Sequence, residues 1–127
     1  MSQYHALLID DNAQNLKVLA QLLMKQGVTY TEVSDSRKLA ALLPTLGHVD
    51  VAFVDLEMPG LDGYEVKDML KLELSGTPII AYTVHMSEIN VVKQLGFDGF
   101  LGKPLDNTRF PDQLARILRG DAVWERT

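Results

Sequence analysis

The chain contains no cysteine, which excludes disulfide bridges and thiol chemistry and is compatible with a reducing cytosol. Its longest apolar runs are far shorter than the ~20 residues that a membrane-spanning helix needs. No stretch is rich in lysine and arginine, and the net charge of −5 disfavours non-specific binding to nucleic acid. We therefore expect a soluble, cytoplasmic protein that contacts neither a membrane nor nucleic acid directly.

What is present fits one ordinary globular domain. The 127 residues can bury a single core, and 46% hydrophobic with 23% charged residues is a typical composition. The first residues lead directly into an apolar run, so we expect no signal peptide there. We expect one domain over residues 1–120 and a frayed tail over residues 121–127.

Short apolar runs alternate with segments of helical periodicity along the chain. We expect strands over residues 4–9, 28–33, 51–55, 77–82 and 100–102. We expect helices between Asn12 and Gly27, over 36–43 and 63–74, from about 87 to before Gly96, and over 108–119. Pro111 favours a late start for the last helix. This alternation predicts an α/β fold, with a doubly wound five-stranded parallel sheet covered by helices on both faces.

Polar residues stand where the predicted strands end. Asp55 closes the apolar run 51–54 and is followed by a loop with proline and glycine, and Asp10 and Asp11 close the run 6–9. Thr83 and Lys103 lie directly after two further strands. Because the carboxyl ends of parallel strands meet at one edge of a sheet, we expect all five side chains to lie close together.

Three carboxylates at close quarters raise one another's pKa and are costly to ionise unless a cation neutralises them. Carboxylate oxygens suit Mg²⁺, which keeps several waters and can also take a phosphoryl oxygen. Asp55 is a candidate nucleophile toward phosphorus. Lys103 offers a positive charge and Thr83 a hydroxyl group, which together with a metal could stabilise a phosphoryl-transfer transition state.

In their order along the chain, these residues resemble the response-regulator receiver domain of two-component and phosphorelay signalling. The resemblance covers residues 4–119 and rests on Asp10-Asp11, Asp55 with Met58-Pro59 and Asp62-Gly63, Thr83, and Lys103-Pro104. It implies a flavodoxin-like (βα)5 fold with strand order 2-1-3-4-5. It also implies that a histidine kinase or phosphotransfer protein donates a phosphoryl group to Asp55. The implied Mg²⁺ ligands are Asp10, Asp11, Asp55 and the backbone carbonyl of Glu57.

The resemblance further implies that Lys103 and Thr83 contact the phosphoryl group and that Phe100 turns inward as the switch aromatic. The surface of the fourth helix, fifth strand and fifth helix would then change its affinity for a downstream protein. On this view the chain is a monomer or weak dimer. It is no enzyme beyond catalysing its own phosphorylation and dephosphorylation.

Two residues depart from the family pattern. Val84 is bulkier than the usual residue after Thr83, and Glu57 places an extra carboxylate beside the phosphate path. We expect both to modulate access to Asp55 and the rate of turnover.

Three alternative functions remain open at this point. A degenerate receiver could bind partners independently of phosphorylation, in which case Asp55→Asn would keep full output. An aspartate-based phosphatase also uses a strand-end aspartate with Mg²⁺, and a screen of small phosphate esters would detect it. A flavodoxin-like electron carrier would be yellow, although Asp10 and Asp11 would repel an anionic flavin.

Overall fold

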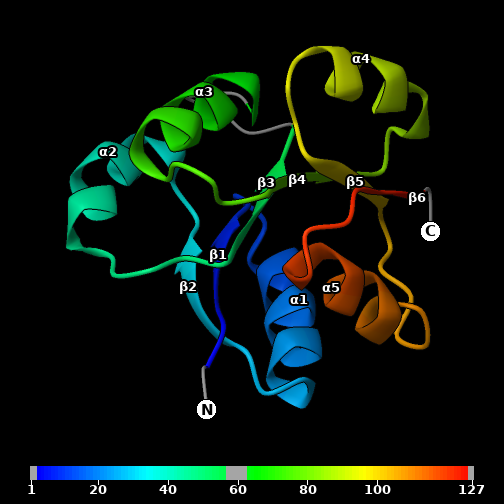
Figure 1. Cartoon of the computed structure of the whole chain (residues 1–127). Helices are drawn as coiled ribbons and strands as arrows, with labels where there is room; N and C mark the ends of the chain where they lie inside the picture. Colours follow the sequence, from blue (N-terminus) through cyan, green and yellow to red (C-terminus); the bar gives the residue numbers. More distant parts are fainter. Residues whose placement is uncertain (1–2, 57–62, 126–127) are drawn as a thin grey trace.

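The computed structural model describes residues 3–56 and 63–125, and within them a parallel sheet lies between two layers of helices (Figure 1). The sheet has the order β2-β1-β3-β4-β5-β6. Its strands are β1 (His5–Ile9), β2 (Thr29–Val33), β3 (Val51–Asp55), β4 (Ile79–Thr83), β5 (Gly99–Gly102) and β6 (Val123–Glu125). The predicted α/β class, the parallel sheet and the order of the first five strands are confirmed.

Helices α1 (Ala13–Lys25) and α5 (Phe110–Leu118) cover one face of the sheet (Figure 1). Helices α2 (Leu39–Leu42), α3 (Gly63–Glu73) and α4 (Ile89–Gln94) cover the other face. Short 3₁₀ turns over Ser36–Lys38, Leu43–Thr45 and Met86–Glu88 flank α2 and precede α4. In the part of the chain that the structure describes, no helix is long and apolar enough to cross a bilayer.

The ends of the helices follow from local chemistry. The Asn12 side chain accepts the backbone N–H of Asn15 at 3.0 Å and so caps α1, as its position predicts. Pro111 lies in the first turn of α5, where its missing N–H leaves no helical hydrogen bond unmade. The helix begins at Phe110 and not at the predicted residue 108, in agreement with the late start that Pro111 favours.

The strands at the centre of the sheet are buried on both faces, and alternate residues point into two separate cores. Leu7 and Ile9 pack with α2, α3 and α4, whereas Leu8 packs with α1 and α5. The rings of Phe53 and Phe110 meet at 6.2 Å between centroids in the second core. This double burial makes the sheet a rigid platform for side chains at the strand ends.

The prediction of five strands followed by a frayed tail is wrong for residues 123–125. These residues form β6, which pairs in parallel with β5 and completes a six-stranded sheet. Three residues are too few for alternation to indicate a strand, and tertiary contacts stabilise this one. Residues 123–125 therefore cover the outer edge of β5, which the prediction from sequence left unpaired. The domain end at residue 120 stays a prediction.

Candidate functional site

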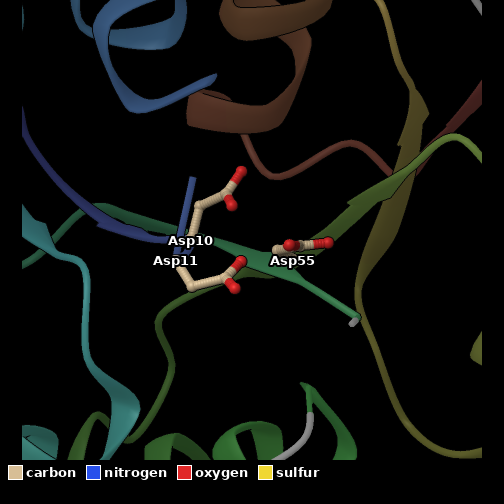
Figure 2. A group of neighbouring side chains, drawn as sticks. All are labelled: Asp10, Asp11 and Asp55. Carbon is tan, nitrogen blue, oxygen red and sulfur yellow. The ribbon is translucent and has the colours of Figure 1, made fainter. Parts of the chain in front are cut away.

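Neighbouring strands bring the predicted side chains to one edge of the sheet. Asp55 is the last residue of β3 and Thr83 the last of β4, whereas Asp10 follows β1 and Lys103 follows β5. The register places Asp55 opposite Tyr82 and Thr83 opposite Gly102, so these strands end at nearly the same level. Figure 2 shows the carboxylates of Asp10, Asp11 and Asp55 gathered at this edge.

Asp10 is fully buried and accepts three hydrogen bonds. One oxygen accepts the backbone N–H of Asn12 at 2.9 Å. The other accepts the hydroxyl of Tyr82 at 2.8 Å and the ammonium of Lys103 at 3.0 Å. Burial raises the pKa of Asp10, but these hydrogen bonds and the lysine charge outweigh it and leave the pKa below its ordinary value. Asp10 is therefore held as a buried carboxylate.

Lys103 lies between two of the three acids. Its ammonium is 3.0 Å from Asp10 and 3.5 Å from Asp55, and it sits 4.3 Å from the centre of the Tyr82 ring. One ammonium against three carboxylates leaves two negative charges at this edge of the sheet. A divalent cation would neutralise that excess.

The three acids have the donor chemistry of a magnesium site. Each can offer an oxygen, and these atoms lie within 4.8 Å of one another. Ligands around an octahedral Mg²⁺ are at most about 4 Å apart, so small side-chain rotations would close the set. Asp10 and Asp55 are buried while Asp11 is exposed, which leaves a solvent side for the waters that Mg²⁺ retains. The residues present therefore fit a hydrated divalent ion.

A pocket of about 350 Å³ opens over these residues. Its lining consists of Asp11, Asn12, Asn15, Asp55, Thr83, Val84, Lys103 and Pro104. The buried Thr83 hydroxyl accepts the backbone N–H of His85 at 3.2 Å. Val84 is 59% exposed and lines the same pocket as Asp55, and its effect on access to Asp55 stays a prediction.

Tyr82 also belongs to the site, although it is not among the residues predicted from the sequence. Burial, followed by the charge of Asp10, raises its pKa well above the ordinary value, so its hydroxyl stays protonated and donates. Its ring also packs edge-on against Phe53, with 6.4 Å between centroids. The sequence contains one signal for this role, since Tyr82 lies one position before the polar end of a predicted strand. A tyrosine buried in a strand needs a hydrogen-bond partner for its hydroxyl group.

The structure leaves two further predicted roles untested, those of Phe100 and Glu57. Phe100 is fully buried and packs in the core that contains residues of α3 and α4. Its movement stays a prediction. Glu57, together with Met58, Pro59 and Asp62, lies outside the described residues.

Known proteins share both the sequence pattern and the fold. A family model, the response regulator receiver domain, matches residues 6–115. The chain is 40% identical to stress response regulator protein 1 of Debaryomyces hansenii over 109 residues, which are 81% of this chain and 45% of that protein. It is 36% identical to the histidine kinase CKI1 of Arabidopsis thaliana over 133 residues, covering 89% of this chain and 11% of that protein. The chemotaxis protein CheY4 of Vibrio cholerae superposes with a TM-score of 0.81 at 22% identity, covering 91% and 99% of the two chains.

Together with the family match, the parallel α/β sheet with an acidic cluster and a lysine at its carboxyl edge defines a receiver-type signalling domain. The chain belongs to the response regulator receiver domain family, of the two-component and phosphorelay type. It spans about half or less of the length of the first curated relatives it matches.

Proposed function

We propose that the chain accepts a phosphoryl group on Asp55 from a phosphohistidine of a histidine kinase or phosphotransfer protein. An oxygen of Asp55 attacks phosphorus and forms a P–O bond while the P–N bond breaks. The electron pair of that bond stays on the imidazole nitrogen, which takes a proton from solvent water. The observation that carries this proposal is the setting of Asp55. Its side chain opens into the pocket, with Lys103 at 3.5 Å and with Asp10 and Asp11 in the same cluster.

Bound Mg²⁺, held by Asp10, Asp11, Asp55 and the backbone carbonyl of Glu57, would supply electrostatic stabilisation of the phosphoryl oxygens. Lys103 already lies between Asp10 and Asp55, so its ammonium can follow negative charge that develops on the phosphoryl group. The Thr83 hydroxyl lines the same pocket and can turn to donate to a phosphoryl oxygen.

The output of the proposed reaction is a change of surface. A phosphoryl group adds about −1.5 to −2 charges, which would draw Thr83 toward Asp55 and bias the packing of Phe100. The face formed by α4, β5 and α5 would change its affinity for a downstream protein. We propose a monomer or weak dimer with no activity on other substrates, and a cytoplasmic site of action.

Intact mass spectrometry tests this proposal. The chain is incubated with phosphoramidate, with and without Mg²⁺, beside Asp55→Asn as an isosteric control. The expected result is a Mg²⁺-dependent gain of one phosphoryl group that the control lacks. No gain in the native chain or in Val84→Ala would overturn the proposal and favour a phosphorylation-independent binding module.

Val84 and Glu57 provide the finer test of turnover. If these residues hinder access to Asp55, Val84→Ala and Glu57→Asn, singly and together, change the rate at which the phosphorylated chain loses its phosphoryl group. An unchanged rate in all three variants would remove both residues from the proposal.

A further inference from the structure

The outer edge of β5 is occupied by a segment of the same chain. β6 lies parallel to β5 and aligns Val123 with Gly99, Trp124 with Phe100 and Glu125 with Leu101. A Cβ atom at Gly99 would stand 2.8 Å from the carbonyl oxygen of Val123, so the missing side chain lets the two strands approach. This edge is therefore shaped to receive an extended backbone.

The α4 side of the edge holds the aromatic residue of the segment. The ammonium of Lys93 lies 5.1 Å from the centre of the Trp124 ring, a cation–π distance. The same ring is partly buried against the core that contains Phe100. Trp124 thus makes an apolar contact and a charge contact at once.

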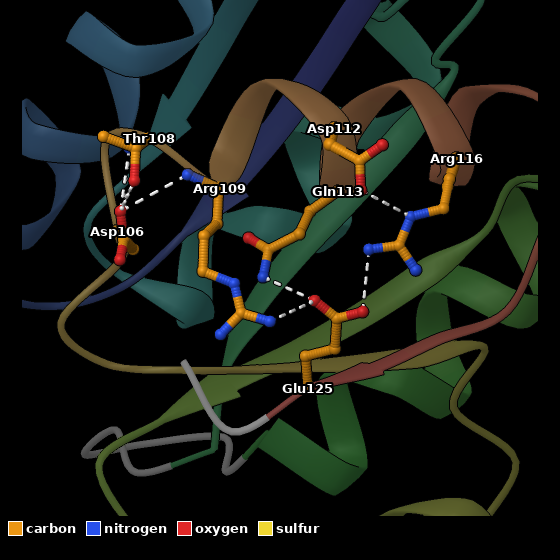
Figure 3. Close-up of polar contacts among 7 residues, drawn as sticks. All are labelled: Asp106, Thr108, Arg109, Asp112, Gln113, Arg116 and Glu125. Carbon is orange, nitrogen blue, oxygen red and sulfur yellow. Dashed lines mark hydrogen bonds and ion pairs between the residues drawn. The ribbon is translucent and has the colours of Figure 1, made fainter.

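The α5 side holds the acidic residue (Figure 3). The carboxylate of Glu125 accepts hydrogen bonds from Gln113 at 2.9 Å and Arg116 at 2.7 Å, and Arg109 lies 3.5 Å away. Gln113 is buried, and Arg116 is also held by Asp112 at 2.9 Å, one turn earlier on the same helix. Arg116 is thus oriented by α5 itself as well as by the strand.

These contacts define the chemistry of a ligand. It is an extended segment that runs parallel to β5 and carries an apolar, an aromatic and an acidic residue in succession. Edge strands pair readily with added strands, and side-chain pockets then select the sequence. Among the described residues the intramolecular occupant spans Val123–Glu125, and Trp124 and Glu125 keep part of their surface exposed. An edge strand held by partly exposed side chains can be exchanged for another of the same pattern.

We propose that the β5 edge between α4 and α5 is a peptide-binding site for an extended aromatic–acidic segment of a partner protein. Residues 123–125 fill this site within the chain until the partner displaces them. The proposal rests on the proposed function only in treating this face as the output surface. Binding itself requires neither Mg²⁺ nor a phosphoryl group.

The test uses the full chain with Trp124→Ala and Glu125→Ala together, which empties the side-chain contacts of the site. A fluorescein-labelled peptide of residues 121–125 with blocked ends is titrated with this variant, and fluorescence anisotropy is measured without Mg²⁺ or phosphoryl donor. We expect saturable binding that is at least about tenfold tighter than to the native chain, whose own strand competes at high effective concentration.

Specificity controls sharpen the result. A peptide with glutamine in place of its glutamate should bind more weakly, and adding Arg116→Gln to the double variant should weaken binding as well. Arg37→Gln is the matched control, because Arg37 is an exposed, ion-paired arginine that follows β2, at the opposite edge of the sheet from β6. It should leave the affinity unchanged.

Absence of binding to the folded double variant would overturn the proposal, and so would equal binding to the native chain. If the double variant fails to fold, the titration is repeated with Glu125→Gln, in which Trp124 remains. A negative mass experiment with phosphoramidate would overturn the proposed function while leaving this binding result intact. The two failures are therefore distinguishable.

Discussion

Two charged clusters at different edges of the sheet are built in opposite ways. At the carboxyl edge, three acids surround one lysine, and Asp10 and Lys103 are almost completely buried. Beside β6, two arginines face one glutamate, and the side chains of Arg116 and Glu125 are 28% and 23% exposed. The first cluster has an excess of buried negative charge. In the second, Asp112 also pairs with Arg116, so two arginines balance two carboxylates, and the cluster reaches solvent.

This difference in burial predicts which cluster loses stability when one residue is substituted and which cluster tolerates substitution. A buried charge that loses its partner keeps its full desolvation penalty, while a solvent-exposed pair is largely replaced by water. The carboxyl edge should therefore respond strongly to single substitutions and to divalent ions. The β6 cluster should respond weakly, as an exchangeable contact requires.

Removal of Lys103 should give the largest effect. Lys103→Met leaves Asp10 and Asp55 without their ammonium, and we expect a loss of about 3 kcal/mol in the free energy of unfolding in Mg²⁺-free buffer. Urea denaturation followed by circular dichroism measures it. Arg116→Met is the matched comparison and should cost clearly less, because water can replace a partly exposed ion pair. Equal losses in the two variants would break the contrast between the clusters.

Tyr82→Phe tests the buried hydrogen bond to Asp10. Loss of one bond to a charged acceptor should cost about 1.5–2 kcal/mol, because Asp10 remains buried with one partner fewer. The same urea series should show a change of less than about 0.5 kcal/mol for Tyr30→Phe, because the Tyr30 hydroxyl is exposed and lies 3.8 Å from the sulfur of Met24. A neutral Tyr82→Phe variant would mean that Lys103 and Asn12 satisfy Asp10 without the tyrosine.

Mg²⁺ should stabilise the folded chain through the acids at the carboxyl edge and not through the β6 cluster. At ten times its dissociation constant, the ion should add about 1.4 kcal/mol to the free energy of unfolding, and the gain should be reduced in Asp11→Asn. Thermal unfolding with and without Mg²⁺, with Ca²⁺ as a comparison ion, measures this gain. Glu125→Gln should respond to Mg²⁺ as the native chain does, and a lost response in that variant would link the two clusters.

The same contrast explains what the sequence could predict. Asp10, Asp55, Thr83 and Lys103 each follow a recognisable strand, and the carboxyl ends of parallel strands share an edge, so a local pattern places them together. Tyr82 has a place in that pattern too, but its bond to Asp10 depends on the depth of each side chain in the folded sheet.

The β6 strand was beyond prediction for a different reason. Its stability comes from Trp124 meeting Lys93 and from Glu125 meeting α5, and neither contact leaves a periodic signal in a three-residue segment. Without knowledge of these contacts with α4 and α5, a short charged segment such as residues 121–127 is predicted to be frayed.

The smallest expected effect is a pH response of the β6 contact. The hydrogen bond from Gln113, helped by Arg116 and opposed by partial burial, holds the pKa of Glu125 below its ordinary value of 4.5. A carboxylate with a lowered folded-state pKa stabilises the docked strand above pH 4.5, and this contribution is lost as the pH falls through the lowered pKa. Because Trp124 is the single tryptophan, acrylamide quenching reports its exposure directly.

Quenching should therefore increase below pH 4.5 while far-UV circular dichroism still shows a folded chain. The change should correspond to less than about 1 kcal/mol, since Glu125 reaches solvent. Glu125→Gln cannot titrate at this position, so its quenching should stay flat over the same window. A native chain that is equally flat would show that Trp124 and the β5 backbone hold the strand without the carboxylate. The proposed binding site would then select for an aromatic residue alone.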